Sequence, residues 1–176
     1  VGEMTLKLRN CAKPGIGMIN GVTAGAGVIL MLACDIVCSS EDAKFIQSFV
    51  NVGLVPDCGG MYLLKETVGL QKAKELMFTA DVISAQEAEK LKMVMHVYTK
   101  EDLKIETEKI AQKIAQGAPM AIMYMKKMLN KYYFIGFLFA LLSSLRVPFL
   151  PELQLVLILT FLLIYGKINR NLFLEK

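Results

Sequence analysis

The chain has 176 residues, enough for one domain with a hydrophobic core, and its formal net charge is +4 at pH 7. It carries no lysine and arginine block and no basic stripe with interleaved aromatic residues, so we expect no binding of nucleic acid. Its four cysteines lack C-x-x-C spacing and its single histidine cannot complete a histidine-rich site. We therefore expect no bound metal, and reduced thiols in a cytoplasmic protein.

Periodicity and turn residues predict short strands that alternate with helices. The helix over residues 25–33 should be buried on every side, because Val28 to Leu32 is continuously apolar. Ser84 and Glu87 form an S-x-x-E capping box for a helix that runs to about residue 92. The expected strands cover residues 15–20, 35–38, 44–47 and 93–98, and further helices are expected over 60–69, 70–79, from 99 to the break at 117–119, and from there to about 131.

Asp35 and Lys126 could each bind a ligand, but we expect neither to do so. Asp35 stands between a buried helix and a strand, where an aspartate usually bonds backbone groups, so we favour that role over a catalytic one. Lys126 lies on the last expected helix, where a lysine can reach a phosphate group as a mobile point charge. We favour simple solvation for its side chain.

The stretch from Asn20 to Gly27 is the most informative motif, because small residues lead directly into a buried helix. Such a turn leaves backbone N–H groups unpaired where a ligand can approach, and glycine permits that approach. Gly25, Ala26 and Gly27 are therefore candidates for binding a developing oxyanion. Taken alone, the pattern is more often tight packing between a helix and a strand.

Several motifs in register resemble those of the crotonase superfamily, the enoyl-CoA hydratases and isomerases. The resemblance covers about residues 4–131 and implies an α/β fold, a partial crotonase-like ββα spiral that begins in the middle of the family fold. It implies an acyl-CoA thioester as substrate, coenzyme A being part of that substrate, with no separate cofactor. Ala26 aligns with a backbone N–H donor to the thioester oxygen, and intact members usually form homotrimers or hexamers. The matching segments are Lys13 to Gly21, Ala24 to Asp35, Ser40 to Phe45, Gly53 to Gly60, Val68 to Leu70 and Ser84 to Ala88.

The resemblance also indicates which catalytic groups are present. Hydratases of this superfamily typically use two glutamates, and the matching positions here hold Ile29 and Phe49. We expect these two side chains to line the substrate pocket. Asp57 matches an aspartate of dienoyl-CoA and epoxyphenylacetyl-CoA isomerases, and apolar neighbours should desolvate it and raise its pKa. The alternative is that Asp57 caps the following helix.

The tail after residue 131 departs from the family pattern, because it contains two long apolar runs on either side of Pro148 and Pro151. We therefore divide the chain into a crotonase-like core, residues 1–131, and an atypical hydrophobic tail, residues 132–176. The two runs could form a membrane hairpin. We favour a tail that was not selected for this fold, such as the product of an altered reading frame.

Three hypotheses on function follow. The first is an isomerase that moves the double bond of an enoyl- or dienoyl-CoA thioester, with Asp57 as a single base and an oxyanion hole near Ala26. The second is a catalytically inactive homologue or fragment that binds acyl-CoA. The third is a protein anchored to a membrane by its tail. The identity of the acyl group does not follow from the sequence.

Overall fold

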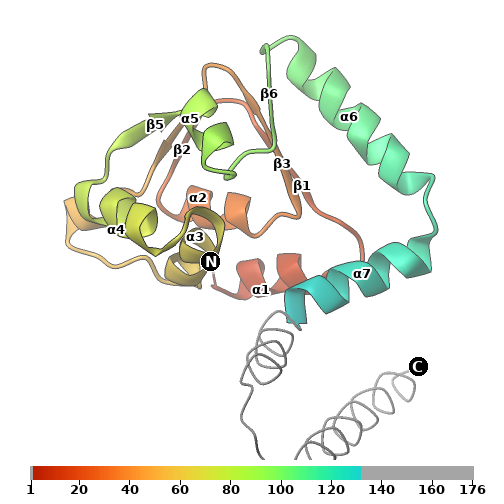
Figure 1. The fold of residues 1–176 in the computed structure, drawn as a ribbon, viewed down its shortest axis with the longest axis horizontal. Helices are drawn as coiled ribbons and strands as arrows, with labels where there is room; N and C mark the ends of the chain where they lie inside the picture. The colour runs from red at the N-terminus through yellow and green to blue at the C-terminus, as the bar shows by residue number, and fades with distance from the viewer. Residues whose placement is uncertain (1, 132–176) are drawn as a thin grey trace, which may run out of the picture. The chain divides into compact units, whose positions relative to one another are not determined.

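The computed structural model describes residues 2–131 of the chain (Figure 1). The chain divides into two compact units, Val1–Tyr133 and Phe134–Lys176, and the second lies outside the described residues. The expectations about the tail, its separate domain over residues 132–176 and its membrane hairpin, also fall outside them and stay predictions. Within residues 2–131, no helix combines the length and the apolar character that crossing a bilayer requires.

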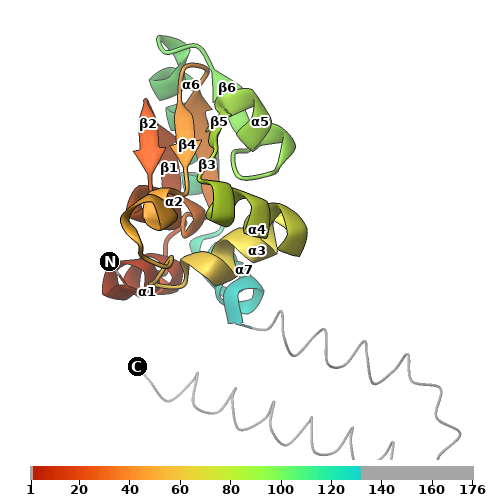
Figure 2. The same ribbon diagram turned by 90° about the vertical axis from the view of Figure 1, so that its left-hand side faces the viewer.

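Two small sheets form the centre of the described unit (Figure 2). In the first sheet β3 (Ile36–Ser40) lies between β1 (Ile16–Ile19) and β6 (His96–Tyr98), and all three strands are parallel. In the second sheet β4 (Lys44–Ile46) lies between β2 (Val22–Ala24) and β5 (Val82–Ser84). β4 pairs with β2 in parallel and with β5 in antiparallel orientation.

The chain passes through the two sheets in a repeated order, strand, strand and helix. β1 and β2 lead into α2 (Ala26–Leu32), and β3 and β4 lead through the 3-10 helix η1 (Ser48–Val52) into α3 (Gly60–Val68). The second repeat lies beside the first, because Ile16 pairs with Ile36 and Val22 pairs with Lys44. This arrangement confirms the expected mixed α/β fold with a ββα order.

The remaining helices enclose these repeats. α4 (Leu70–Thr79) packs against α3, and α5 (Ala85–Lys90) lies beside β5 and β6. α6 (Asp102–Ala115) packs along β1, β3 and β6, whereas α7 (Pro119–Lys131) is joined to α1 (Gly2–Asn10) by hydrogen bonds (Figure 1). The core lies between α2, α3, α4 and the sheets, and its fully buried members include Val28, Ile29, Phe45 and Leu64.

Most expected elements are confirmed within a few residues. α4 has the predicted bounds, α2 is one residue shorter at each end, and Ser84 Oγ accepts a hydrogen bond from the Glu87 N–H at 3.2 Å, as the capping box predicts. Residues 22–24, interpreted as part of a turn, form β2 instead. The sequence reasoning also assigned no element to α1 or β5.

Candidate functional site

The glycine turn at the start of α2 is held in one conformation by its neighbours. Gly25 has φ 50° and ψ −114°, a backbone conformation that residues with a side chain rarely adopt. Its N–H donates to the Ile46 carbonyl at 2.9 Å, and a Cβ at this position would lie 3.2 Å from Ser48 Oγ. The turn therefore requires glycine, both for its torsion angles and for the approach of the chain that follows β4.

The two residues after Gly25 present their backbone N–H groups without an acceptor in the described part of the chain. The Gly25 carbonyl already accepts from Val28 and Ile29, so the helical bonding of α2 begins beyond Ala26 and Gly27. Both residues are half-buried, and Gly27 lines an open groove of about 900 Å³ that α1, β1, β2 and α2 surround. Two donors thus lie close to a space that a ligand can enter.

The predicted pocket residues Phe49 and Ile29 lie in different environments. Phe49 belongs to η1 and is half-buried, and its ring would lie 3.7 Å from a Cβ at Gly25. Ile29 has no exposed surface, and its Cδ1 would lie only 2.7 Å from a Cβ at Gly60, the first residue of α3. Ile29 therefore fills the contact between α2 and α3, and its role at a substrate stays a prediction.

Asp57 lies on the loop that precedes α3, and its side chain is exposed. The expected desolvation by apolar neighbours is wrong for the described residues, because Leu54, Val55 and Met61 are themselves exposed by 62%, 71% and 53%. These side chains extend outward from a loop in which Cys58 has a positive φ. Apolar residues that are close in the sequence therefore do not shield the carboxylate.

The alternative role of Asp57 as a helix cap is also wrong. The N-cap of α3 is Gly59, with φ 84°, and this cap has no side-chain hydrogen bond. Asp57 contributes only its carbonyl to the turn, accepting from the Gly60 N–H at 2.7 Å. Its carboxylate interacts with the neighbouring thiol: the hydrogen bond from Cys58, with partial burial, raises the pKa of that thiol. The carboxylate remains accessible to a ligand.

The buried Lys126 forms an ion pair with the exposed residue Asp35, and the sequence predicted only part of this arrangement. Asp35 Oδ2 accepts from the Gly15 N–H at 2.7 Å, which confirms its backbone-bonding role, and also lies 2.7 Å from Lys126 Nζ. Solvation of Lys126 is wrong, because its side chain is 6% exposed and also donates to the Leu8 and Lys13 carbonyls. Lys126 thereby joins α7 to α1 and to the segment that precedes β1, and each of the two charges already has a partner within the fold.

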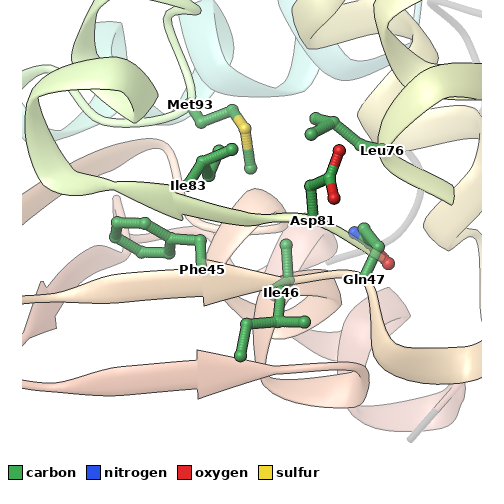
Figure 3. Close-up of a pocket in the computed structure, with 8 residues that line it drawn as sticks. Phe45, Ile46, Gln47, Leu76, Asp81, Ile83 and Met93 are labelled. Atoms are coloured by element: carbon green, nitrogen blue, oxygen red, sulfur yellow. The ribbon is translucent and has the colours of Figure 1, made fainter. Parts of the chain in front are cut away.

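A second concavity, shown in Figure 3, is lined by residues of β4, β5 and α4 and has a volume of only about 10 Å³. Leu76, Ile83 and Met93 surround it, and the Asp81 carboxylate points toward Leu76. Gln47 lies at its edge, 3% exposed, and neither amide atom has a partner in the described part of the chain. This volume suits about one water molecule, so the cavity is too small for an acyl group.

Comparison with known proteins agrees with this geometry. Residues 1–134 match the family of enoyl-CoA hydratases and isomerases. The chain is 44% identical over 118 residues to a short-chain-enoyl-CoA hydratase of Clostridioides difficile, covering 76% of that protein. It is 38% identical over 125 residues to a mitochondrial Delta(3,5)-Delta(2,4)-dienoyl-CoA isomerase of Dictyostelium discoideum, covering 43% of it.

Solved structures give the same result. An enoyl-CoA hydratase/isomerase from Cupriavidus metallidurans superimposes with a TM-score of 0.74 at 37% identity, over 81% of this chain and 55% of that one. An enoyl-CoA hydratase from Bacillus anthracis gives a TM-score of 0.72 at 32% identity, over 74% of this chain and 50% of that one. This chain thus spans about half the length of most of these relatives. With its ββα order and its glycine turn, it belongs to the enoyl-CoA hydratase/isomerase family of the crotonase superfamily.

Proposed function

We propose that the protein moves the double bond of an enoyl- or dienoyl-CoA thioester, with Asp57 as its single catalytic base. The observation that carries this proposal is that the loop before α3 keeps one exposed carboxylate, Asp57, that caps no helix. Of the three positions that the family resemblance singles out, only Asp57 carries a carboxylate, and it is exposed and caps no helix. The other two hold Ile29 and Phe49, which cannot accept a proton.

For a 3-enoyl thioester, the proposed reaction is a transfer of one proton. The Asp57 carboxylate removes a proton from C2, the electron pair forms a dienolate, and the negative charge moves onto the thioester oxygen. The protonated Asp57 then returns the proton to C4, and the double bond moves from C3–C4 to C2–C3. Atoms and charge balance within substrate and base, so we infer that no separate cofactor takes part.

The oxyanion is assigned to the glycine turn. The N–H groups of Ala26 and Gly27 have no acceptor in the described residues, and the turn that holds them is restrained by the Gly25 N–H bond to Ile46. Donors that are already oriented stabilise charge that develops in the transition state without a cost for reorganisation. Removing one donor of this kind typically costs about 100- to 1000-fold in rate.

Addition of water is disfavoured by the same arrangement. It needs a group that orients the water as well as a group that delivers a proton, and family hydratases typically use two glutamates for this work. Ile29 has no exposed surface, so neither its chemistry nor its position permits that role. Double-bond movement needs only one base, which fits the single carboxylate.

The proposal is tested by deuterium uptake from heavy water into 3-enoyl-CoA and 3,5-dienoyl-CoA, followed by mass spectrometry. We expect Asp57→Asn to slow uptake by about 100-fold or more, the usual contribution of a positioned base. Asp81→Asn is the matched control, because it removes an exposed aspartate that lies on the α4–β5 connection, and it should exchange at the wild-type rate.

Two results would contradict the proposal. Equal exchange by wild type and Asp57→Asn would exclude Asp57 as the base, and a 3-hydroxyacyl-CoA product would indicate water addition. The second candidate function is binding of an acyl-CoA thioester without catalysis, and the exposure of Asp57 favours it, because a catalytic base must be held in position against its substrate. Saturable binding of an enoyl-CoA by a folded chain that exchanges no deuterium would support this candidate.

A further inference from the structure

A pocket of about 350 Å³ is formed by the end of α1, the segment that follows it, and α7. Three cationic side chains line it, namely Arg9, Lys126 and Lys127, and none of its lining residues carries a carboxylate. Glu3 is the only acid in residues 2–15 and 119–131, and it pairs with Lys7 on the exposed side of α1. The elements around the pocket therefore carry an excess of positive charge.

One of the three cations is balanced within the fold, and the other two are not. Lys126 pairs with Asp35 and donates to two backbone carbonyls, so its three N–H donors are all used. Neither Arg9 nor Lys127 forms an ion pair with another residue of the range 2–131, and both side chains are half-buried. Two unbalanced charges of one sign in one concave site attract an anion.

Arg9 is held in position by Asn130, where α7 meets the end of α1 (Figure 1). Its Nη2 donates to Asn130 Oδ1 at 3.2 Å, and Asn130 Nδ2 donates to the Arg9 carbonyl at 3.0 Å. The amide is neutral, so it orients the guanidinium without cancelling its charge. The other guanidinium N–H groups have no acceptor among the described residues. A guanidinium oriented in this way can bind two oxygens of one phosphate group.

A simpler role for these cations would be to neutralise the negative end of the α1 dipole. The fold already provides this through other groups, because Lys126 bonds the Leu8 carbonyl and Asn130 bonds the Arg9 carbonyl. Lys127 has no hydrogen bond to the end of α1, and the Arg9 guanidinium is directed to the Asn130 side chain. The charges of Arg9 and Lys127 therefore exceed what the end of the helix requires.

We propose that this pocket binds a phosphomonoester, with the phosphate group held by Arg9 and Lys127. Its volume lies at the lower end of the range of small-molecule sites, about 300–1,000 Å³, and exceeds what a phosphate group alone fills. Ala12 and Met123 add apolar surface to the lining, so the site suits a phosphate attached to a small organic group. The proposal concerns binding alone and does not depend on the reaction proposed above.

Isothermal titration calorimetry of the full chain with phenyl phosphate tests the proposal. We expect saturable one-to-one binding with a dissociation constant on the order of 0.1 mM. Lys127→Met should weaken binding at least about tenfold, because it removes one of the two unbalanced charges. Arg9→Gln should have an effect of the same size, since it removes the other charge but keeps an amide donor for Asn130. Circular dichroism and urea unfolding establish that both variants fold like the wild type.

Lys74→Met is the matched control. Lys74 is exposed on α4 and does not line the pocket, so the loss of its charge should leave binding unchanged. The proposal is overturned if the folded wild type does not bind phenyl phosphate or if the folded Lys127→Met variant binds it as the wild type does. Equal weakening by Lys74→Met and Lys127→Met would also overturn it, because the attraction would then come from the net charge of the chain.

Competition identifies the source of the phosphate group. CoA carries a phosphomonoester that dephospho-CoA lacks. Displacement of phenyl phosphate by CoA but not by dephospho-CoA would support the proposal, with CoA as the occupant. Binding of phenyl phosphate that neither compound displaces would support it with a separate phosphomonoester as the occupant. Equal displacement by both compounds would overturn it, because the site would then not recognise a phosphomonoester.

Discussion

Asp35 and Asp57 both lie on short segments beside a helix of the same core, but the structure uses them in opposite ways. The Asp35 carboxylate is held by the Gly15 N–H and by a buried lysine that also bonds two backbone carbonyls. The Asp57 carboxylate is exposed and interacts only with the thiol next to it among the described residues. The fold uses the Asp35 carboxylate to hold two segments together, whereas it leaves the Asp57 carboxylate exposed on a loop.

The largest expected effect on stability comes from loss of the buried lysine that binds Asp35. Lys126→Met should lower the free energy of unfolding by about 2 kcal/mol, because it removes the buried ammonium group that bonds Asp35 and the Leu8 and Lys13 carbonyls. Lys127→Met removes the same charge from the next position of α7, which forms no ion pair within residues 2–131. Urea unfolding should show a change of less than about 0.5 kcal/mol for this control. Equal losses in the two variants would mean that the pair contributes nothing.

A smaller change in the free energy of unfolding should distinguish Ser84, which caps a helix, from Asp57, which does not. Ser84→Ala should lower the free energy of unfolding by about 1 kcal/mol, because Ser84 Oγ accepts from the Glu87 N–H at the start of α5. Asp57→Ala should change it by less than about 0.5 kcal/mol, since the cap of α3 is Gly59. Thermal and urea unfolding measure both variants under the same conditions. A loss at Asp57 as large as that at Ser84 would show that Asp57 stabilises α3 after all.

The smallest effect concerns the thiol beside the exposed carboxylate. Asp57 raises the pKa of Cys58 above its ordinary value, so Asp57→Asn should lower that pKa and increase the thiolate fraction at pH 8. Alkylation of Cys58 by iodoacetamide, followed by peptide mass spectrometry, should accelerate about threefold for each half unit by which the pKa falls. Cys11 is exposed, and its unchanged rate serves as the internal control. Slower alkylation of Cys58 in the variant would contradict the assigned interaction.

Local patterns predicted much of the fold, because the helices and several strands have a period and an end signal in the sequence. Leu70–Thr79 and the Ser84 cap are examples, since both depend on residues within one or two turns. Three-residue strands such as β2 and β5 are too short to show alternation, so they are recognised only by the partner strand that each one finds. The ββα order depended on the family resemblance and not on periodicity.

The candidate site was harder to predict from the sequence than the fold, because the residues around it come from distant parts of the chain. Lys126 is 91 positions from Asp35, and neither residue carries a local signal that the two are paired. The apolar neighbours of Asp57 suggested a desolvated acid, but whether a loop side chain faces the core or the solvent is decided by packing. The need for glycine at position 25 could have been suspected from the motif, whereas its contact with Ser48 could not.

The contact between Ile29 and Gly60 has a consequence for protein engineering. Position 29 is where the family resemblance would put a hydratase glutamate, and here its side chain is fully buried against the first residue of α3. Ile29→Glu alone would bury an ionisable group without a partner, at a cost of several kcal/mol. Conversion of this chain into a hydratase would therefore begin by moving α3 away from α2, and only a second substitution could then introduce the acid.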